Sequence, residues 1–134
     1  MKITIVTATW NSGATLRHTM RSVLSQSYPN IEHIIVDGGS TDNTMEIVHE
    51  LEPEYQGCLR YISEKDKGIY DAMNKGIAMS TGNIVGILNS DDFYTSDSVL
   101  STVVSAFEDG NIDAVYGDIH YVQDLSLIHI SEPT

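Results

Sequence analysis

The chain has 134 residues, 41% of them hydrophobic, which is enough for one domain with a buried core. Its formal net charge of −12 at pH 7 argues against non-specific binding to nucleic acid or to an anionic membrane, because those surfaces attract basic proteins. The single cysteine, Cys58, excludes an internal disulfide, and no apolar run approaches the ~18 residues that a transmembrane helix needs.

Strand and helix patterns alternate along most of the chain. Continuous apolar or β-branched runs predict buried strands over residues 2–8, 31–36, 59–62, 84–88 and 112–116. Apolar residues three or four apart predict helices over 16–24, 45–51, 69–77 and 96–107. This order predicts an α/β fold, a three-layer α-β-α sandwich around a mostly parallel sheet.

The chain has neither an internal repeat nor a linker, so we expect a single domain over residues 1–122. Residues 123–134 do not continue the pattern, and they resemble translated vector sequence. We interpret them as a non-native or disordered tail. Within the third predicted helix, Gly76 costs about 1 kcal/mol relative to alanine, which indicates close packing against another backbone or a ligand.

Two adjacent carboxylates, Asp91 and Asp92, follow the fourth predicted strand. They repel each other and cannot be buried unpaired, and open α/β folds bind ligands at the carboxyl ends of their strands. The pair is tolerable in a solvated turn or beneath a divalent cation. Oxygen ligands suit Mg²⁺ or Mn²⁺, which complete their coordination with water and substrate phosphates. The second interpretation makes this a candidate site for a metal-bound phosphate ligand.

Other candidate residues follow the ends of the first three predicted strands. Asp37 can accept a hydrogen bond from a base or ribose, or it can cap its own loop in an Asx-turn. Trp10 can stack on a base or lie at the rim of the core, and Asn11 is a ligand contact or a helix cap. Residues 64–68 gather basic side chains in a β-α loop, where a solvated charge run is the common explanation.

Several familiar signatures are absent from the sequence. No Gly-x-Gly-x-x-Gly follows the first strand, and there is no Gly-Lys-Ser/Thr loop and no Gly-x-Ser-x-Gly turn. A nucleotidyltransferase stays open as an alternative, although residues 11–15 lack the glycine-rich basic loop of that class. An acidic α/β nucleotide-binding module without catalysis is the other alternative, although a receiver-like domain would place its acidic pocket after the first and third strands.

Five segments in register resemble the donor-binding half of a family 2 glycosyltransferase. They are VTATWN (6–11), LSQSYPN (24–30), IVDGGSTDNT (35–44), EKDKGIYDAMNKG (64–76) and LNSDD (88–92). The fourth segment is the most distinctive and is similar to a bacterial subgroup that builds cell-surface polysaccharides. The resemblance covers residues 1–122 and implies a Rossmann-like GT-A fold that binds a nucleotide-sugar and is truncated here.

The resemblance also implies an activity and a set of site residues. The activity is an inverting, metal-dependent hexosyltransferase that moves a sugar from a UDP- or GDP-linked donor to a hydroxyl of a glycan or lipid-linked acceptor. The implied cofactor is Mg²⁺ or Mn²⁺, held by Asp92 and Asp91. The implied donor-binding residues are Ala8, Thr9, Trp10, Asn11, Asp37, Asp66 and Asp91.

Two departures from the family pattern matter for activity. Asn89 stands where many relatives have a first aspartate. The general base of inverting members is expected beyond residue 122, so this chain is expected to bind donor without turnover. We expect a cytoplasmic location, leaving open peripheral attachment at the inner face of the membrane, and no nucleic-acid partner.

Overall fold

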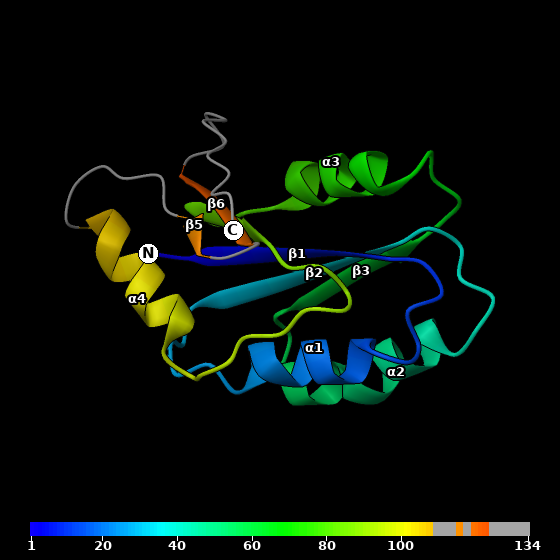
Figure 1. Ribbon diagram of the computed structural model, residues 1–134, viewed down its shortest axis with the longest axis horizontal. Coiled ribbons are helices and arrows are strands. Elements are labelled where there is room, and N and C mark those ends of the chain that lie inside the picture. The colour runs from blue at the N-terminus through cyan, green and yellow to red at the C-terminus, as the bar shows by residue number, and fades with distance from the viewer. Residues whose placement is uncertain (109–114, 117–118, 124–134) are drawn as a thin grey trace.

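The computed structural model describes residues 1–108, 115–116 and 119–123 (Figure 1). Over these residues the strands form one sheet in the order β3-β2-β1-β4-β6-β5. The four parallel strands are β1 (Ile3–Thr9), β2 (Ile31–Asp37), β3 (Leu59–Ser63) and β4 (Ile84–Ile87). Their runs of β-branched residues suit strands that are covered on both faces.

Helices cover both faces of the sheet, as Figure 1 shows with α1 and α2 below it and α3 above it. The helices are α1 (Leu16–Leu24), α2 (Thr44–Leu51), α3 (Ile69–Met79) and α4 (Val99–Glu108), with a short 3-10 helix η1 (Glu52–Tyr55) after α2. None of these described helices is both long enough and apolar enough to cross a membrane.

The pleat of β1 divides the apolar side chains between two cores. Ile5 belongs to the larger core, together with residues of α1, α2 and α4, and the next residue, Val6, belongs to the smaller core beneath α3. The predicted three-layer sandwich is therefore confirmed. Gly76 of α3 packs closely, as predicted, but against side chains, because a Cβ there would lie 2.3 Å from Cγ1 of Val6.

The end of the chain differs from the prediction. Residues 112–116 were expected to form one strand, and β5 (Val115–Tyr116) lies within that range, while residues 112–114 are outside the described part. A further strand that the sequence did not predict, β6 (Ile119–Gln123), pairs antiparallel with β4 and with β5. The alternation of strands and helices predicts parallel strands joined by crossover helices. It does not predict a strand that pairs antiparallel with the strand before it. The predicted tail lies outside the described residues from 124 onward.

The parallel strands all end at one edge of the sheet, and this edge positions the candidate site. Thr9, Asp37 and Ser63 are the last residues of β1, β2 and β3, and the strand register places them in one row. The loops that follow β1, β2, β3 and β4 are consequently neighbours, although they are far apart in the sequence.

Candidate functional site

Two adjoining hollows lie at the carboxyl edge of the sheet. The first has a volume of about 510 Å³ and the second about 490 Å³. Both are lined by Ala8, Ser12, Ile69 and Ser90, so we treat them as one feature, the carboxyl-edge groove. Its position is the one at which open α/β sheets bind ligands.

The first hollow is bordered by the end of β1 and by the loop before α3. Ala8, Thr9 and Trp10 line one side, and Trp10 is 67% exposed, so its ring is free to stack on a flat ligand. Asp66 lines the hollow from the other loop and is held there by a hydrogen bond of 3.0 Å from the Gly68 amide to its Oδ1. Gly38 leaves the space for this carboxylate, since a Cβ at position 38 would lie 2.8 Å from Asp66 Oδ2.

Asp37 does not line the groove. Its side chain is fully buried, and its Oδ1 accepts hydrogen bonds from the hydroxyls of Thr9 (2.7 Å) and Ser40 (2.5 Å). Its Oδ2 accepts from the Ser63 hydroxyl and from the amides of Gly39 and Ser40. Of the two interpretations left open by the sequence, this geometry shows the loop cap, extended by bonds to β1 and β3.

These hydrogen bonds also set the charge of Asp37. Burial alone raises the pKa of the carboxyl, but hydrogen bonds from Ser40, Thr9 and Ser63 outweigh burial and hold the pKa below its usual value. Asp37 is therefore a buried anion that ties together the ends of three strands. It acts on the groove through Thr9 and through the loop that contains Gly38.

Asn11 adopts a left-handed backbone conformation (φ 49°) and connects two loops. Its Oδ1 accepts hydrogen bonds from the backbone amides of Thr41 (2.8 Å) and Asp42 (3.3 Å). The residue also lines the second hollow. It is not the cap of α1, which begins at Leu16, so the alternative of a helix cap was wrong.

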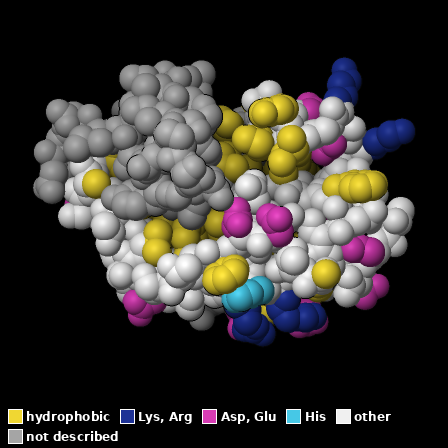
Figure 2. All heavy atoms as spheres, viewed as in Figure 1, with side chains coloured by type: hydrophobic (Ala, Val, Ile, Leu, Met, Phe, Trp, Pro, Cys, Tyr) yellow, Lys and Arg dark blue, Asp and Glu magenta, His cyan; other side chains and the backbone are white. Residues whose placement is uncertain are grey.

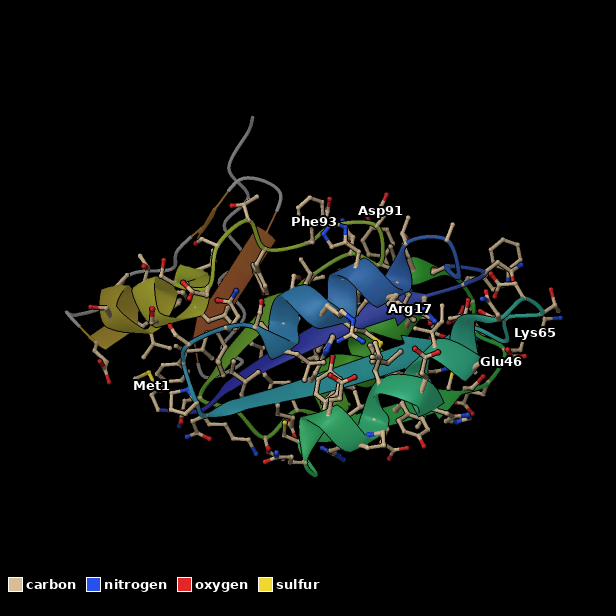
Figure 3. The ribbon with its side chains drawn as sticks, turned by 90° about the horizontal axis from the view of Figure 1, so that it is seen from below. Met1, Arg17, Glu46, Lys65, Asp91 and Phe93 are labelled. Atoms are coloured by element: carbon tan, nitrogen blue, oxygen red, sulfur yellow. The ribbon has the colours of Figure 1, made fainter. Side chains whose placement is uncertain are left out.

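The two acidic residues after β4 occupy different places. Asp91 is exposed and lines the second hollow, and Figure 3 shows it on the loop beside α1. Asp92 is half-buried, lines neither hollow, and accepts a 3.3 Å hydrogen bond from the side-chain amide of Asn89. Of this acidic pair, Asp91 is thus the residue that lines the groove, together with Ala8 and Asn11.

The carboxylates of Asp91 and Asp92, after β4, could supply oxygen ligands to a divalent cation. In the described part of the chain, no group of three or more His, Cys, Asp or Glu side chains is arranged to hold a metal ion. A cation at this loop would therefore take at most two carboxylates from the described residues. Mg²⁺ and Mn²⁺ bind in this way when waters and ligand phosphates supply the remaining oxygens.

Lys65 gives the groove a positive charge. It is exposed, lines the first hollow, and forms no ion pair with another described residue. Most other basic side chains are paired with acids, namely Lys2, Arg17, Arg21, Arg60 and Lys75. Figure 2 shows basic side chains against acidic ones at the bottom of the view and others that project from the surface at the upper right. Lys65 is consequently available to an anionic ligand.

Sequence reasoning missed the side chains that support this edge. Thr15, Thr19, Ser22 and Gln26 all make hydrogen bonds to the segment between Ser90 and Leu100. Their spacing of three or four residues was readable from the sequence as one face of a helix. The apolar positions beside them predict the helix, but a polar helix face does not by itself indicate which distant segment it contacts.

The fold is that of the GT-A glycosyltransferases. The mannosyltransferase PcManGT from Pyrobaculum calidifontis, solved with GDP-Man and Mn²⁺, superposes with a TM-score of 0.76 and 25% identity, over 84% of this chain and 34% of that one. The S. aureus TarS fragment 1–349, solved with UDP-GlcNAc, superposes with a TM-score of 0.73 and 22% identity, over 81% and 32%. At that identity the second likeness shows the fold alone.

The family model described as Glycosyl transferase family 2 matches residues 4–127, and the chain belongs to this family. A PGL/p-HBAD biosynthesis glycosyltransferase of Mycobacterium tuberculosis is 34% identical over 116 residues, which are 86% of this chain and 45% of that protein. An uncharacterized glycosyltransferase of Nostoc is 31% identical over 115 residues, 86% of this chain and 35% of the other. The chain spans less than half the length of these relatives.

Proposed function

We propose that this chain is the donor-binding part of an inverting hexosyltransferase of bacterial cell-surface polysaccharide synthesis. It binds a UDP- or GDP-linked sugar in the carboxyl-edge groove and, within the whole enzyme, passes the sugar to a hydroxyl of a glycan or lipid-linked acceptor. The observation that carries the proposal is the groove itself, in which Trp10 and Asp66 line one hollow and Asp91 lines the adjoining one.

The nucleobase occupies the first hollow in this proposal. Trp10 offers an exposed ring face for stacking, and Ala8 and Thr9 line the same hollow. Asp66 Oδ2 makes no hydrogen bond to another described residue, so it is free to accept one from a ring N–H, which uracil and guanine both carry. Asp37 contributes by holding Thr9 and the loop at Gly38.

The diphosphate lies at the second hollow. Asp91 lines it and Asp92 is the next residue, so these two carboxylates would hold Mg²⁺ or Mn²⁺. Such an ion, when bound, supplies positive charge that stabilises the departing nucleoside diphosphate. Asn89 orients the Asp92 carboxylate through its amide, and Lys65 adds a positive charge to a chain of net charge −12. The Mn²⁺ and GDP-Man bound to the similar mannosyltransferase support this assignment.

The remaining chemistry belongs to the rest of the enzyme. An inverting transfer needs a carboxylate that removes the proton from the acceptor hydroxyl. We assign no residue to this role among the described ones and place the base beyond residue 122. The isolated chain therefore binds donor without turnover.

Calorimetry tests the proposed function. UDP or GDP is titrated into the chain with Mn²⁺, with Mg²⁺ and with EDTA, and we expect measurable binding only with a metal. Asp92→Asn and Asp91→Asn each weaken this binding by about 10-fold or more, because each removes a charged ligand. The matched control Asp97→Asn removes an exposed charge from the same segment and keeps wild-type affinity. Equal binding in EDTA, or an equal loss in the control, would contradict the proposal.

A further inference from the structure

α1 carries a polar stripe beside its apolar one. Leu16, Met20 and Val23 are buried in the larger core. Thr15, Thr19 and Ser22 each stand one position earlier, so they lie about 100° around the helix. With Gln26, just beyond the end of α1, they form what we call the polar stripe. Thr19, Ser22 and Gln26 are buried polar residues.

Each member of the polar stripe makes a hydrogen bond to the segment between Ser90 and Leu100. The hydroxyls of Thr15 and Thr19 donate to the carbonyl oxygens of Ser90 (2.7 Å) and Asp92 (2.6 Å). The Ser22 hydroxyl accepts from the Tyr94 amide at 3.1 Å. Gln26 donates to the Ser96 carbonyl (2.6 Å) and accepts from the Leu100 amide (3.0 Å). The stripe therefore satisfies backbone groups of a segment that lacks regular structure up to α4.

The first two of these bonds bracket the acidic pair. The Ser90 carbonyl belongs to the peptide group before Asp91, and the Asp92 carbonyl to the peptide group after Asp92, so the two peptide groups that flank the acidic pair are hydrogen-bonded to side chains at the start of α1. The stacked rings of His18 and Phe93, 4.1 Å apart, hold the next residue of the loop against the same helix. Figure 3 shows Asp91 and Phe93 on this loop beside α1. Two side chains that repel each other are thereby kept in one arrangement before any cation binds.

We propose that Thr19 is a positioning residue for the Asp91–Asp92 cation site, acting through the carbonyl of Asp92. This inference rests on the proposed function, because it takes the acidic pair as the site of the cation. Thr19 is 1% exposed and lines neither hollow, so it does not touch the ligand. Its effect is on the geometry of the loop that presents the carboxylates.

The test replaces the hydroxyl and measures metal-dependent binding. Thr19→Val keeps the shape of the side chain and removes the donor, and we expect UDP with Mn²⁺ to bind about 10-fold more weakly, the size of effect seen when support for a metal ligand is lost. Thr19→Ser restores the donor and most of the affinity.

The matched control is Thr4→Val. Thr4 is also fully buried, and its hydroxyl donates to Glu32 (2.8 Å), but it lies near the start of β1, away from the groove. This variant loses stability in urea for a similar reason and keeps wild-type binding of UDP with Mn²⁺. A loss of affinity in Thr4→Val equal to that in Thr19→Val would reduce Thr19 to a purely structural role and overturn the inference.

Amide hydrogen exchange gives a readout that needs no ligand. The Asp92 amide donates to the Asn89 carbonyl at 3.1 Å and the Tyr94 amide to Ser22, so both exchange faster in Thr19→Val than in Thr4→Val if Thr19 holds the loop. Faster exchange with unchanged metal-dependent binding overturns the positioning role alone. Absence of metal-dependent binding in the wild-type chain overturns the proposed function, and this inference with it.

Discussion

Asp37→Asn is expected to lower the free energy of unfolding by about 3 kcal/mol or more, because it removes a buried anion from a full set of donors. The two oxygens of Asp37 accept hydrogen bonds from Thr9, Ser40 and Ser63 and from the loop amides of Gly39 and Ser40. An asparagine of the same size turns an NH₂ group toward these donors, so at least one of them loses its acceptor.

Urea unfolding measures this loss, and Glu46→Gln is the control, since it removes an exposed negative charge from α2. The free energy of unfolding of the control should stay within about 0.5 kcal/mol of the wild-type value. Asp37→Asn also weakens nucleotide binding by loosening Thr9 and the Gly38 loop. A variant that binds nucleotide poorly but unfolds like the wild type would show instead that Asp37 contacts the base directly.

Stability is expected to fall by about 2 kcal/mol between pH 7 and pH 5 because of His33. Burial lowers the pKa of this imidazole from 6.5 to about 3, and its two nitrogens lie 2.9 Å from the Thr7 hydroxyl and 2.8 Å from that of Tyr55. The folded chain keeps His33 neutral, whereas the unfolded chain binds a proton below pH 6.5. The stabilisation is therefore complete above pH 6.5 and is lost progressively down to about pH 3.

The pH dependence is measured by urea unfolding at several values between pH 5 and pH 7. In His33→Gln the side chain no longer titrates, so we expect a lower stability at pH 7 and a flatter dependence on pH. His49→Gln, which changes an exposed histidine of α2, should keep the wild-type slope. If His33→Gln loses stability with acid as steeply as the wild type, the buried imidazole is not the source.

The layered fold could be predicted because it depends on short-range patterns. The apolar runs of β1, β2 and β4 and the helical spacing of Leu16, Met20 and Val23 are local signals, and each gave an element close to its observed bounds. The position of β6 in the sheet could not be predicted in this way, because it depends on which edge of β4 is free to pair with an antiparallel strand. The pairing of distant segments is a property of the assembled sheet.

The site was predicted less completely, for the same reason. The sequence named Asp37 and Asp66 without indicating that one is buried and the other lines the groove. That difference arises because the ends of β1, β2 and β3 form one row, so Thr9 and Ser63 occupy both oxygens of Asp37. Thr9 lies 28 positions from Asp37 in the sequence and Ser63 lies 26 positions from it, so local patterns cannot show that these residues are hydrogen-bonded.

Paramagnetic NMR tests most directly whether a cation joins the acidic pair to a nucleotide diphosphate in the groove. Mn²⁺ broadens the signals of nearby nuclei, so Mn²⁺ added with UDP or GDP to the ¹⁵N-labelled chain should broaden the amides of residues 89–93 and 8–12. The amides of Asn30 and Asn83, which flank the starts of β2 and β4, should stay sharp. In Asp92→Asn the broadening around the groove should be lost. Broadening centred on another face, or unchanged in Asp92→Asn, would contradict the account.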